Sequence, residues 1–469
     1  MEPWQPGSSS AQWESQWHSD DVSRVKYFAE LLAVKARADT RLYDNDLLIF
    51  ITFLLTLYDD DEFMRGKVYD VMRSWGGSQP GRIWSTQKWL NEWMNVEMAL
   101  ARMTDTAWRS QHGVSKQLFR KLVADLQDEL APCTRSLRAP VPVAMAVSMT
   151  LMRLRLGTAC SSIATYFGVG ASTAHKYILL TLTAIAKVYE GRVIYLPKGD
   201  EMKADMQLIE AKGSVVGIGW ALDGTDIPVR ARSVDVVAKR NRKGVVSDRV
   251  LLLANDDLII RWAQIGMPGS AADGRAFALS SLETVIRSGT WPGTGADVSK
   301  DVLGVAVPPQ ILVDAAFAAS KNTLRPFEGA ELDADAAKQE YNFLHSSLRM
   351  LIERLNGVLK RRFGTLNKPA EWWEDNPRFL EINACLIVHN LARAGGCRDY
   401  ELTDEELELL MQDRDDEHVP GDVEESSEDV ASAASIRAAL CSFIALSGAA
   451  KQRYDNTAPS RHGHARTHL

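Results

Sequence analysis

The sequence has few cysteines, and no motif joins them. Its 469 residues include five cysteines, and no two of them stand in a CxxC spacing. Scattered single cysteines exclude a disulfide-rich secreted scaffold and give no support to a structural zinc site. We therefore expect free thiols in a reducing compartment.

The sequence also lacks a long hydrophobic run. The longest run, Leu47 to Tyr58, covers about a dozen residues, whereas a membrane-spanning helix needs about 20. Residues 1–20 are polar and rich in Trp and Ser, so we expect no signal peptide. These observations predict no membrane partner, and a buried helix is the better interpretation of residues 47–58.

A large excess of charge of one sign occurs in a single segment. The chain carries a net charge of −7, but residues 401–430 alone contain 14 Asp and Glu against one Arg. The rest of the chain is therefore mildly basic, which fits a nucleic-acid-binding body with an acidic appendage. A disordered, solvated tail explains the same acidic run, so charge alone does not decide between them.

Composition and periodicity divide the chain into five regions. We expect disorder over 1–40, a helical region of unknown role over 41–130, a helix-turn-helix-like DNA-binding region over 140–195, an α/β domain over 213–395, and an acidic, largely disordered tail over 400–469. Ser115 is expected to cap a helix within the second region.

The region over 140–195 contains a helix, a turn at 168–170 and a second helix, with small and apolar residues at packing positions. In a helix-turn-helix the second helix enters the major groove. Ser172, His175 and Lys176 are therefore candidates for DNA contact. A tight helical hairpin inside a bundle gives the same pattern, so this interpretation stays open.

From Gly213 the periodicity becomes strand-like. Strands are expected over 215–222, 227–231, 249–254, 258–265 and 310–314, and a helix over 273–287. An amphipathic helix over 344–363 follows, with its leucines on one face and its polar residues on the other. Strands followed by helix, strand and helix indicate an α/β domain.

Three acidic residues stand on these elements. Asp223 follows the first strand, Asp314 ends the strand over 310–314, and Glu353 lies on the polar face of the last helix. Hard carboxylate oxygens on rigid elements suit the divalent metals of nucleases. Taken singly, each has a commoner structural role as a turn residue, a helix cap or an ion-pair partner.

Five sequence blocks then occur in one order: Leu222–Pro228, Asn241–Gly244, Gly266–Ser270 with Asp273, Val313–Phe317 and Ile352–Phe363. They resemble the signature blocks of PIF/Harbinger-type transposases, which belong to the DDE superfamily of endonucleases. The stretch over 108–185 is similar to the helix-turn-helix-bearing region of that family.

The resemblance implies an α/β RNase-H-like catalytic domain, a mixed sheet flanked by helices, behind a helical N-terminal region. It implies a metal-dependent DNA endonuclease or transposase-like protein that hydrolyses phosphodiester bonds and can join strands with two Mg²⁺ or Mn²⁺ ions. Asp223, Asp314 and Glu353 would be the catalytic, metal-binding triad. Double-stranded DNA, a Myb-like DNA-binding partner protein and a homodimer are the expected partners, and the nucleus, with the cytoplasm as alternative, is the expected compartment.

The sequence departs from the family pattern at a few positions. Asp226 stands where the family often has His, Ala272 stands where His usually precedes Asp273, and Ala315 and Ala316 make the second acid's surroundings less polar. No departure removes a triad carboxylate. A domesticated, non-catalytic DNA-binding protein is the alternative function, and an interaction protein that binds partners through its helices and acidic tail is a third.

Basic residues cluster near the expected site. Phosphate contact is the functional interpretation, and a solvated surface is the other. The candidates are Lys239, Arg240, Arg242, Lys243, Lys360, Arg361 and Arg362.

Overall fold

The fold is described from a computed structural model. It describes residues 96–131, 141–213, 215–292, 298–329, 332, 335–369, 371–403, 405–406 and 427–447. The expectations for residues 1–40 and 41–95, which include the apolar run over 47–58, and for the most acidic part of the tail lie outside these residues. The chain divides into two compact units, Met1–Ala101 with Ser161–Ala171, and Arg102–Cys160 with Ser172–Leu469.

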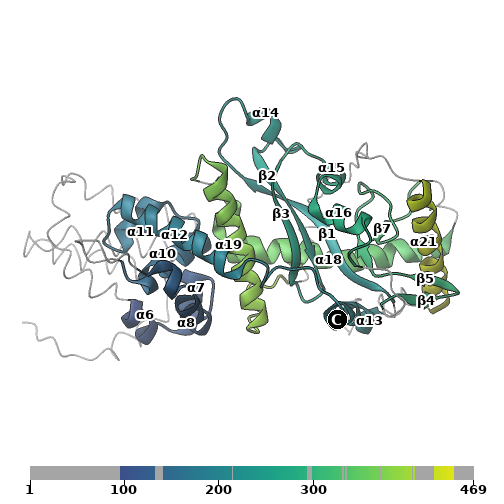
Figure 1. The fold of residues 1–469 in the computed structure, drawn as a ribbon, viewed down its shortest axis with the longest axis horizontal. Helices are drawn as coiled ribbons and strands as arrows, with labels where there is room; N and C mark the ends of the chain where they lie inside the picture. The colour runs from purple at the N-terminus through teal and green to yellow at the C-terminus, as the bar shows by residue number, and fades with distance from the viewer. Residues whose placement is uncertain are drawn as a thin grey trace, which may run out of the picture. The chain divides into compact units, whose positions relative to one another are not determined.

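A five-stranded mixed sheet forms the centre of the second unit (Figure 1). Its order is β3 (Ile260–Pro268), β2 (Ser247–Ala254), β1 (Ile218–Pro228), β6 (Gln310–Leu312) and β7 (Thr323–Leu324). The first three strands pair antiparallel, whereas β6 is parallel to β1 and β7 is parallel to β6. A separate hairpin joins β4 (Lys300–Val302) and β5 (Val305–Val307). The predicted mixed sheet with flanking helices is confirmed.

Strand β1 is one strand where the sequence predicted two. Asp-Gly at 223–224 suggested a turn, and a second strand was expected over 227–231. Instead the segment pairs without a break with β2, from Ala221 opposite Ala254 to Pro228 opposite Ser247. Continuous pairing in the middle of the sheet therefore overrides the local turn preference.

The helix predicted over 273–287 is two helices, α15 (Asp273–Ala278) and α16 (Ser281–Arg287). The Ser280 side chain accepts a hydrogen bond from the Glu283 backbone N–H and so caps the start of α16. Serine forms such caps more readily than it continues a helix, which accounts for the break.

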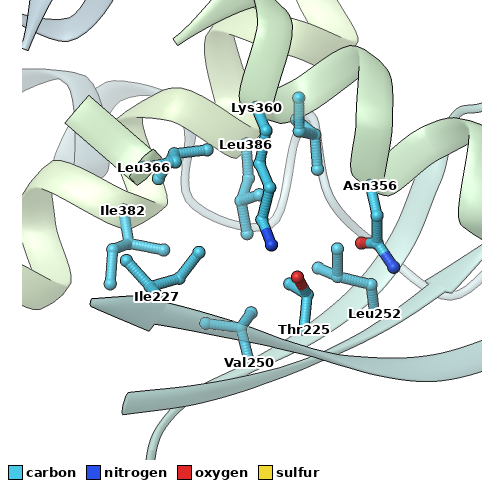
Figure 2. Close-up of a pocket in the computed structure, with 10 residues that line it drawn as sticks. Thr225, Ile227, Val250, Leu252, Asn356, Lys360, Leu366, Ile382 and Leu386 are labelled. Atoms are coloured by element: carbon cyan, nitrogen blue, oxygen red, sulfur yellow. The ribbon is translucent and has the colours of Figure 1, made fainter. Parts of the chain in front are cut away.

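Alternation along the strands gives the sheet two faces. The first packs against α13 (Asp200–Gly213), α15 and α16, with a core of Trp220, Leu222, Leu251, Leu253, Ile311, Val313, Met202, Met206, Phe277, Leu282 and Ile286. The second is covered by α18 (Ala336–Arg362) and α19 (Asp375–Ala394), where side chains of Thr225, Ile227, Val250 and Leu252 meet Asn356, Lys360, Ile382 and Leu386 (Figure 2). From Ala221 onward, the odd-numbered residues of β1 therefore face α18.

Helix α18 begins at an Asp335 cap, whose carboxylate accepts a hydrogen bond from the Ala337 N–H at 2.9 Å. It is longer than the predicted helix over 344–363. Its predicted apolar face is buried at Leu344, Leu348, Leu351, Ile352, Leu355, Val358 and Leu359, and a short 3₁₀ turn, η2 (Gly364–Asn367), follows it.

The N-terminal region is helical where it is described. Its helices are α6 (Val96–Arg102), α7 (Asp105–His112), α8 (Lys116–Asp125), α9 (Gln127–Leu130), α10 (Val143–Leu156), α11 (Cys160–Tyr166) and α12 (Ala171–Tyr189). Ser115 caps α8 through a hydrogen bond from the Leu118 N–H, as predicted. Helices α11 and α12 flank the expected turn, and their arrangement as a helix-turn-helix stays a prediction.

A helix forms inside the predicted disordered tail. Helix α21 (Ser427–Ser447) lies against α18 and β5, with Ile436, Leu440 and Ile444 buried (Figure 1). The prediction of disorder is wrong for these residues, because apolar side chains at helical spacing find a surface to cover. By length and composition alone, α21 is the one helix among the described residues that is apolar enough to cross a membrane.

Buried Asp205 on α13 ties that helix to the sheet. Its carboxylate accepts hydrogen bonds from Trp220 Nε1 at 2.8 Å, Asn255 Nδ2 at 2.7 Å, and the Arg261 guanidinium at 2.7 and 2.8 Å. These donors belong to β1, to the loop after β2 and to β3. One carboxylate thus fixes the strand that carries Asp223.

We expect Asp205→Ala to lower the free energy of unfolding by about 3–5 kcal/mol, because it leaves the Arg261 charge and two other donors unpaired. Urea denaturation followed by circular dichroism measures the change. Gln207→Ala on the exposed side of the same helix is the control and should change the value by less than about 0.5 kcal/mol. Equal stability of the two variants would contradict the role of Asp205.

Candidate active site

The parallel pairing of β1 with β6 places two triad residues side by side. Ala221 lies opposite Leu312 in this ladder, and Asp223 and Asp314 each follow two residues later. Neighbouring strands lie about 4.8 Å apart, and residues two apart share a face. Asp223 and Asp314 are therefore adjacent at the sheet surface that α18 covers, as the strand-end spacing predicted.

Helix α18 brings the third acid to the same surface. Arg349, Glu353, Asn356 and Lys360 follow each other at intervals of three and four residues, which makes one stripe along the helix. This polar stripe faces the sheet and is shielded from solvent, since the Arg349 and Glu353 side chains are 9% and 15% exposed. Asp314 is 30% exposed, so the cluster opens at its side.

Arg349 joins the three acids. Its Nη1 lies 3.2 Å from Asp314 Oδ1 and its Nη2 lies 3.3 Å from Glu353 Oε1. Burial opposes the charge of Arg349, but the fields of Asp223, Asp314 and Glu353 outweigh it and raise its pKa. The structure thus brings all three predicted site residues around one guanidinium.

A second group of acids lies on the other face of β1. Arg249 binds Asp226 at 3.1 Å and lies 3.3 Å from Asp273 Oδ1, and Asn241 Nδ2 donates to Asp226 at 2.9 Å. A Cβ added at Gly224 would stand 2.0 Å from Asp273 Oδ1, so a larger residue there would force this carboxylate to move. Asp226, one of the positions at which the sequence departs from the pattern that it resembles, therefore belongs to this second group.

Asp273 was quoted in the sequence blocks but not predicted as a site residue. Its pKa is raised from 3.8 to about 6, because burial and the nearby Asp223, Asp226 and Asp314 raise it more than Arg249 lowers it. Arg249 Nη1 lies 3.3 Å from its Oδ1 as an ion pair, but no donor among the described residues makes a hydrogen bond to this atom. The signal that could have found it is its place in the third block, four residues after Gly269, which packs closely against Ser247 of β2.

Comparison with known protein families gives a match over the part of the chain that carries these acids. Residues 222–390 match the family described as DDE superfamily endonuclease. The matched segment contains Asp223, Asp314 and Glu353, together with Arg249, Asp273 and Arg349. No curated protein and no solved structure matches the chain.

The carboxylates in residues 222–390 have the chemistry of ligands for a divalent metal. In the described part of the chain, no set of three or more His, Cys, Asp or Glu side chains is arranged to hold a metal ion. The triad nevertheless supplies only hard oxygen donors, which suit Mg²⁺ or Mn²⁺. It also already gathers around one cation, the Arg349 guanidinium. The chemistry of the donor set therefore fits the metal.

Several of the predicted phosphate contacts in residues 222–390 make contacts within the protein instead. Arg362 is fully buried and donates to the Asp399 backbone oxygen, so its prediction as a DNA contact is wrong. Lys239 pairs with Asp248 at 2.8 Å, and Arg361 pairs with Glu406. These side chains complete the fold around them.

Lys360 points from α18 toward Thr225 in a narrow pocket lined mostly by apolar side chains (Figure 2). Burial lowers its pKa, and Asp226 and Glu353 act in the opposite direction. Lys360 was predicted as a surface phosphate contact. Its position between α18 and the sheet does not match that prediction.

Other predicted contacts lie on the surface. Arg240, Arg242 and Lys243 are exposed on residues 229–246, which we call the β1–β2 arm and which contains the short helix α14 (Val236–Lys239) (Figure 1). The prediction missed Arg230 and Arg232, which are exposed on the same arm. Ser172, His175 and Lys176 are exposed on α12, and the His175 ring lies 4.6 Å from that of Trp372.

The raised pKa of Asp273 predicts a pH dependence of metal-free stability. Between pH 4 and 6 the unfolded carboxyl has lost its proton while the folded one keeps it, so stability falls as pH rises through this range. We expect Asp273→Asn to remove this fall. Urea denaturation in a metal chelator, from pH 3.5 to 7, measures it, and parallel curves for wild type and variant would contradict the assignment.

Proposed function

We propose that residues 213–395 form an RNase-H-like, metal-dependent DNA endonuclease of the DDE type in a transposase-like protein of the PIF/Harbinger kind. The observation that supports it most is the gathering of Asp223, Asp314 and Glu353 around Arg349 inside the segment that matches DDE endonucleases. Three carboxylates from two parallel strands and a covering helix are a rigid oxygen-donor set.

The proposed chemistry is phosphodiester hydrolysis, with strand transfer as its extension. Asp223, Asp314 and Glu353 would hold two Mg²⁺ or Mn²⁺ ions. Such a pair, when bound, activates a water or a DNA 3′-hydroxyl and stabilises the leaving oxygen. The fold holds the carboxylates close together and shields Glu353 from bulk water. It leaves the Asp314 side of the site open to a DNA backbone.

The proposed DNA contacts lie on the β1–β2 arm and on α12. The arm exposes Arg230, Arg232, Arg240, Arg242 and Lys243 but only one acid, Asp235. Such a charge balance favours phosphate contact. The proposal extends to double-stranded DNA as substrate, the nucleus as compartment, and a Myb-like protein and a second copy of the chain as partners.

One observation favours the alternative of a non-catalytic DNA-binding protein. Arg349 forms ion pairs with two of the three acids, so the cluster can also serve as a structural ion-pair network. The two functions differ in whether the acids are needed for DNA cleavage.

We expect Glu353→Gln to abolish Mg²⁺- or Mn²⁺-dependent nicking of supercoiled plasmid, because an amide cannot replace the carboxylate as a metal ligand. Asp223→Asn and Asp314→Asn should behave alike. Glu340→Gln, at an exposed position of the same helix, is the control and should nick like wild type. Equal nicking by the Glu353 and Glu340 variants would sink the endonuclease proposal, and retained DNA binding without nicking in wild type would favour the alternative.

The arm should make DNA binding dependent on salt. Each lost phosphate contact lowers the slope of log K against log salt by about 0.9, so replacing Arg242 and Lys243 together by Ala should lower it by about 2. Fluorescence anisotropy with a duplex at several salt concentrations measures it. Arg287→Ala with Lys300→Ala removes two charges elsewhere on the domain and should leave the slope unchanged; equal slopes for both pairs would rule out the arm.

A further inference from the structure

Arg349 lies where a metal ion would have to bind. Its two terminal nitrogens contact one oxygen of Asp314 and one of Glu353, two of the three proposed ligands. Its side chain is 9% exposed, so the guanidinium fills the space between the strand and the helix. These contacts, at 3.2 and 3.3 Å, hold both acids next to the same guanidinium.

The guanidinium of Arg349 lies in the field of all three acids. Asp223, Asp314 and Glu353 would repel each other without a cation between them, and Arg349 is the side chain on which all three act. A divalent ion brought to the same oxygens would neutralise them and would repel the guanidinium. The ion and Arg349 therefore compete for the carboxylates.

We propose that Arg349 is a built-in counter-cation, which holds the acids in place in the metal-free protein and leaves Asp314 and Glu353 when a divalent metal binds. This inference rests on the proposed endonuclease function. The released guanidinium stays on α18, one helical turn from Glu353, and is suited to bind a DNA phosphate through two parallel hydrogen bonds. Metal loading and binding of the DNA backbone are thereby linked through one side chain.

The test measures Mn²⁺ binding without DNA and without a reaction, by electron paramagnetic resonance of free Mn²⁺ over a titration of the full chain. We expect Arg349→Met to bind Mn²⁺ about tenfold more tightly than wild type, because the competing cation is gone. Arg354→Met removes the same charge at a different face of the same helix, and it should bind within about twofold of wild type.

A second readout covers loss of folding. Without metal, Arg349→Met should have a lower melting temperature than wild type, and Mn²⁺ should raise it more than it raises that of wild type. If Arg349→Met does not fold, Arg349→Lys keeps the charge but offers a single ammonium group, and it should still bind Mn²⁺ more tightly than wild type.

The outcomes separate this inference from the proposed function. Wild type that binds Mn²⁺, with Arg349→Met binding no more tightly than Arg354→Met, overturns the counter-cation role and leaves the endonuclease standing. Weaker binding by Arg349→Met would show that the guanidinium orients the ligands and does not compete with the metal. If neither wild type nor any variant binds Mn²⁺, the metal site and this inference both fall.

Discussion

Carboxylates that are held side by side need a positive charge between them, and in this protein Arg349 supplies it. Asp223 and Asp314 stand on adjacent parallel strands and Glu353 stands on the helix that covers them. Burial makes their repulsion costly and gives the cation between them its importance. The order of the acid site therefore depends on a cation, whether a guanidinium or a metal.

The alternation of strand β1 separates two tasks. From Ala221 onward, odd-numbered residues face α18, where Asp223 joins the proposed catalytic acids. Even-numbered residues face α15, where Asp226, Arg249 and Asp273 form their own ion-pair group around Gly224. A single strand thus supports a proposed metal site on one face and a structural charge network on the other. This division gives the unusual Asp226 a role that does not weaken the triad.

Much of this domain could be predicted from the sequence. The hydrophobic pattern found α18 and the strands, and the resemblance of sequence blocks selected three acids that the structure brings together. Local sequence rules failed where contacts with other parts of the fold determine the structure. The Asp-Gly of β1 forms no turn because β2 pairs across it, and Ser280 splits a helix that periodicity had joined. Arg362 looked like a surface cation, but the segment around Asp399 buries it, a contact between residues distant in the sequence. The ion-pair partners of Arg349 and Arg249 depend on side-chain directions, which spacing along the chain does not give.

The most direct test is a crystal structure of the protein grown with Mn²⁺, with anomalous diffraction recorded to locate the ions. The account predicts anomalous peaks about 2.1 Å from carboxylate oxygens of Asp223, Asp314 and Glu353, with the Arg349 guanidinium withdrawn from Asp314 and Glu353. Arg349 unmoved between the two acids, with Mn²⁺ absent from the site or bound elsewhere, would contradict it and favour a DNA-binding protein whose acid cluster is structural.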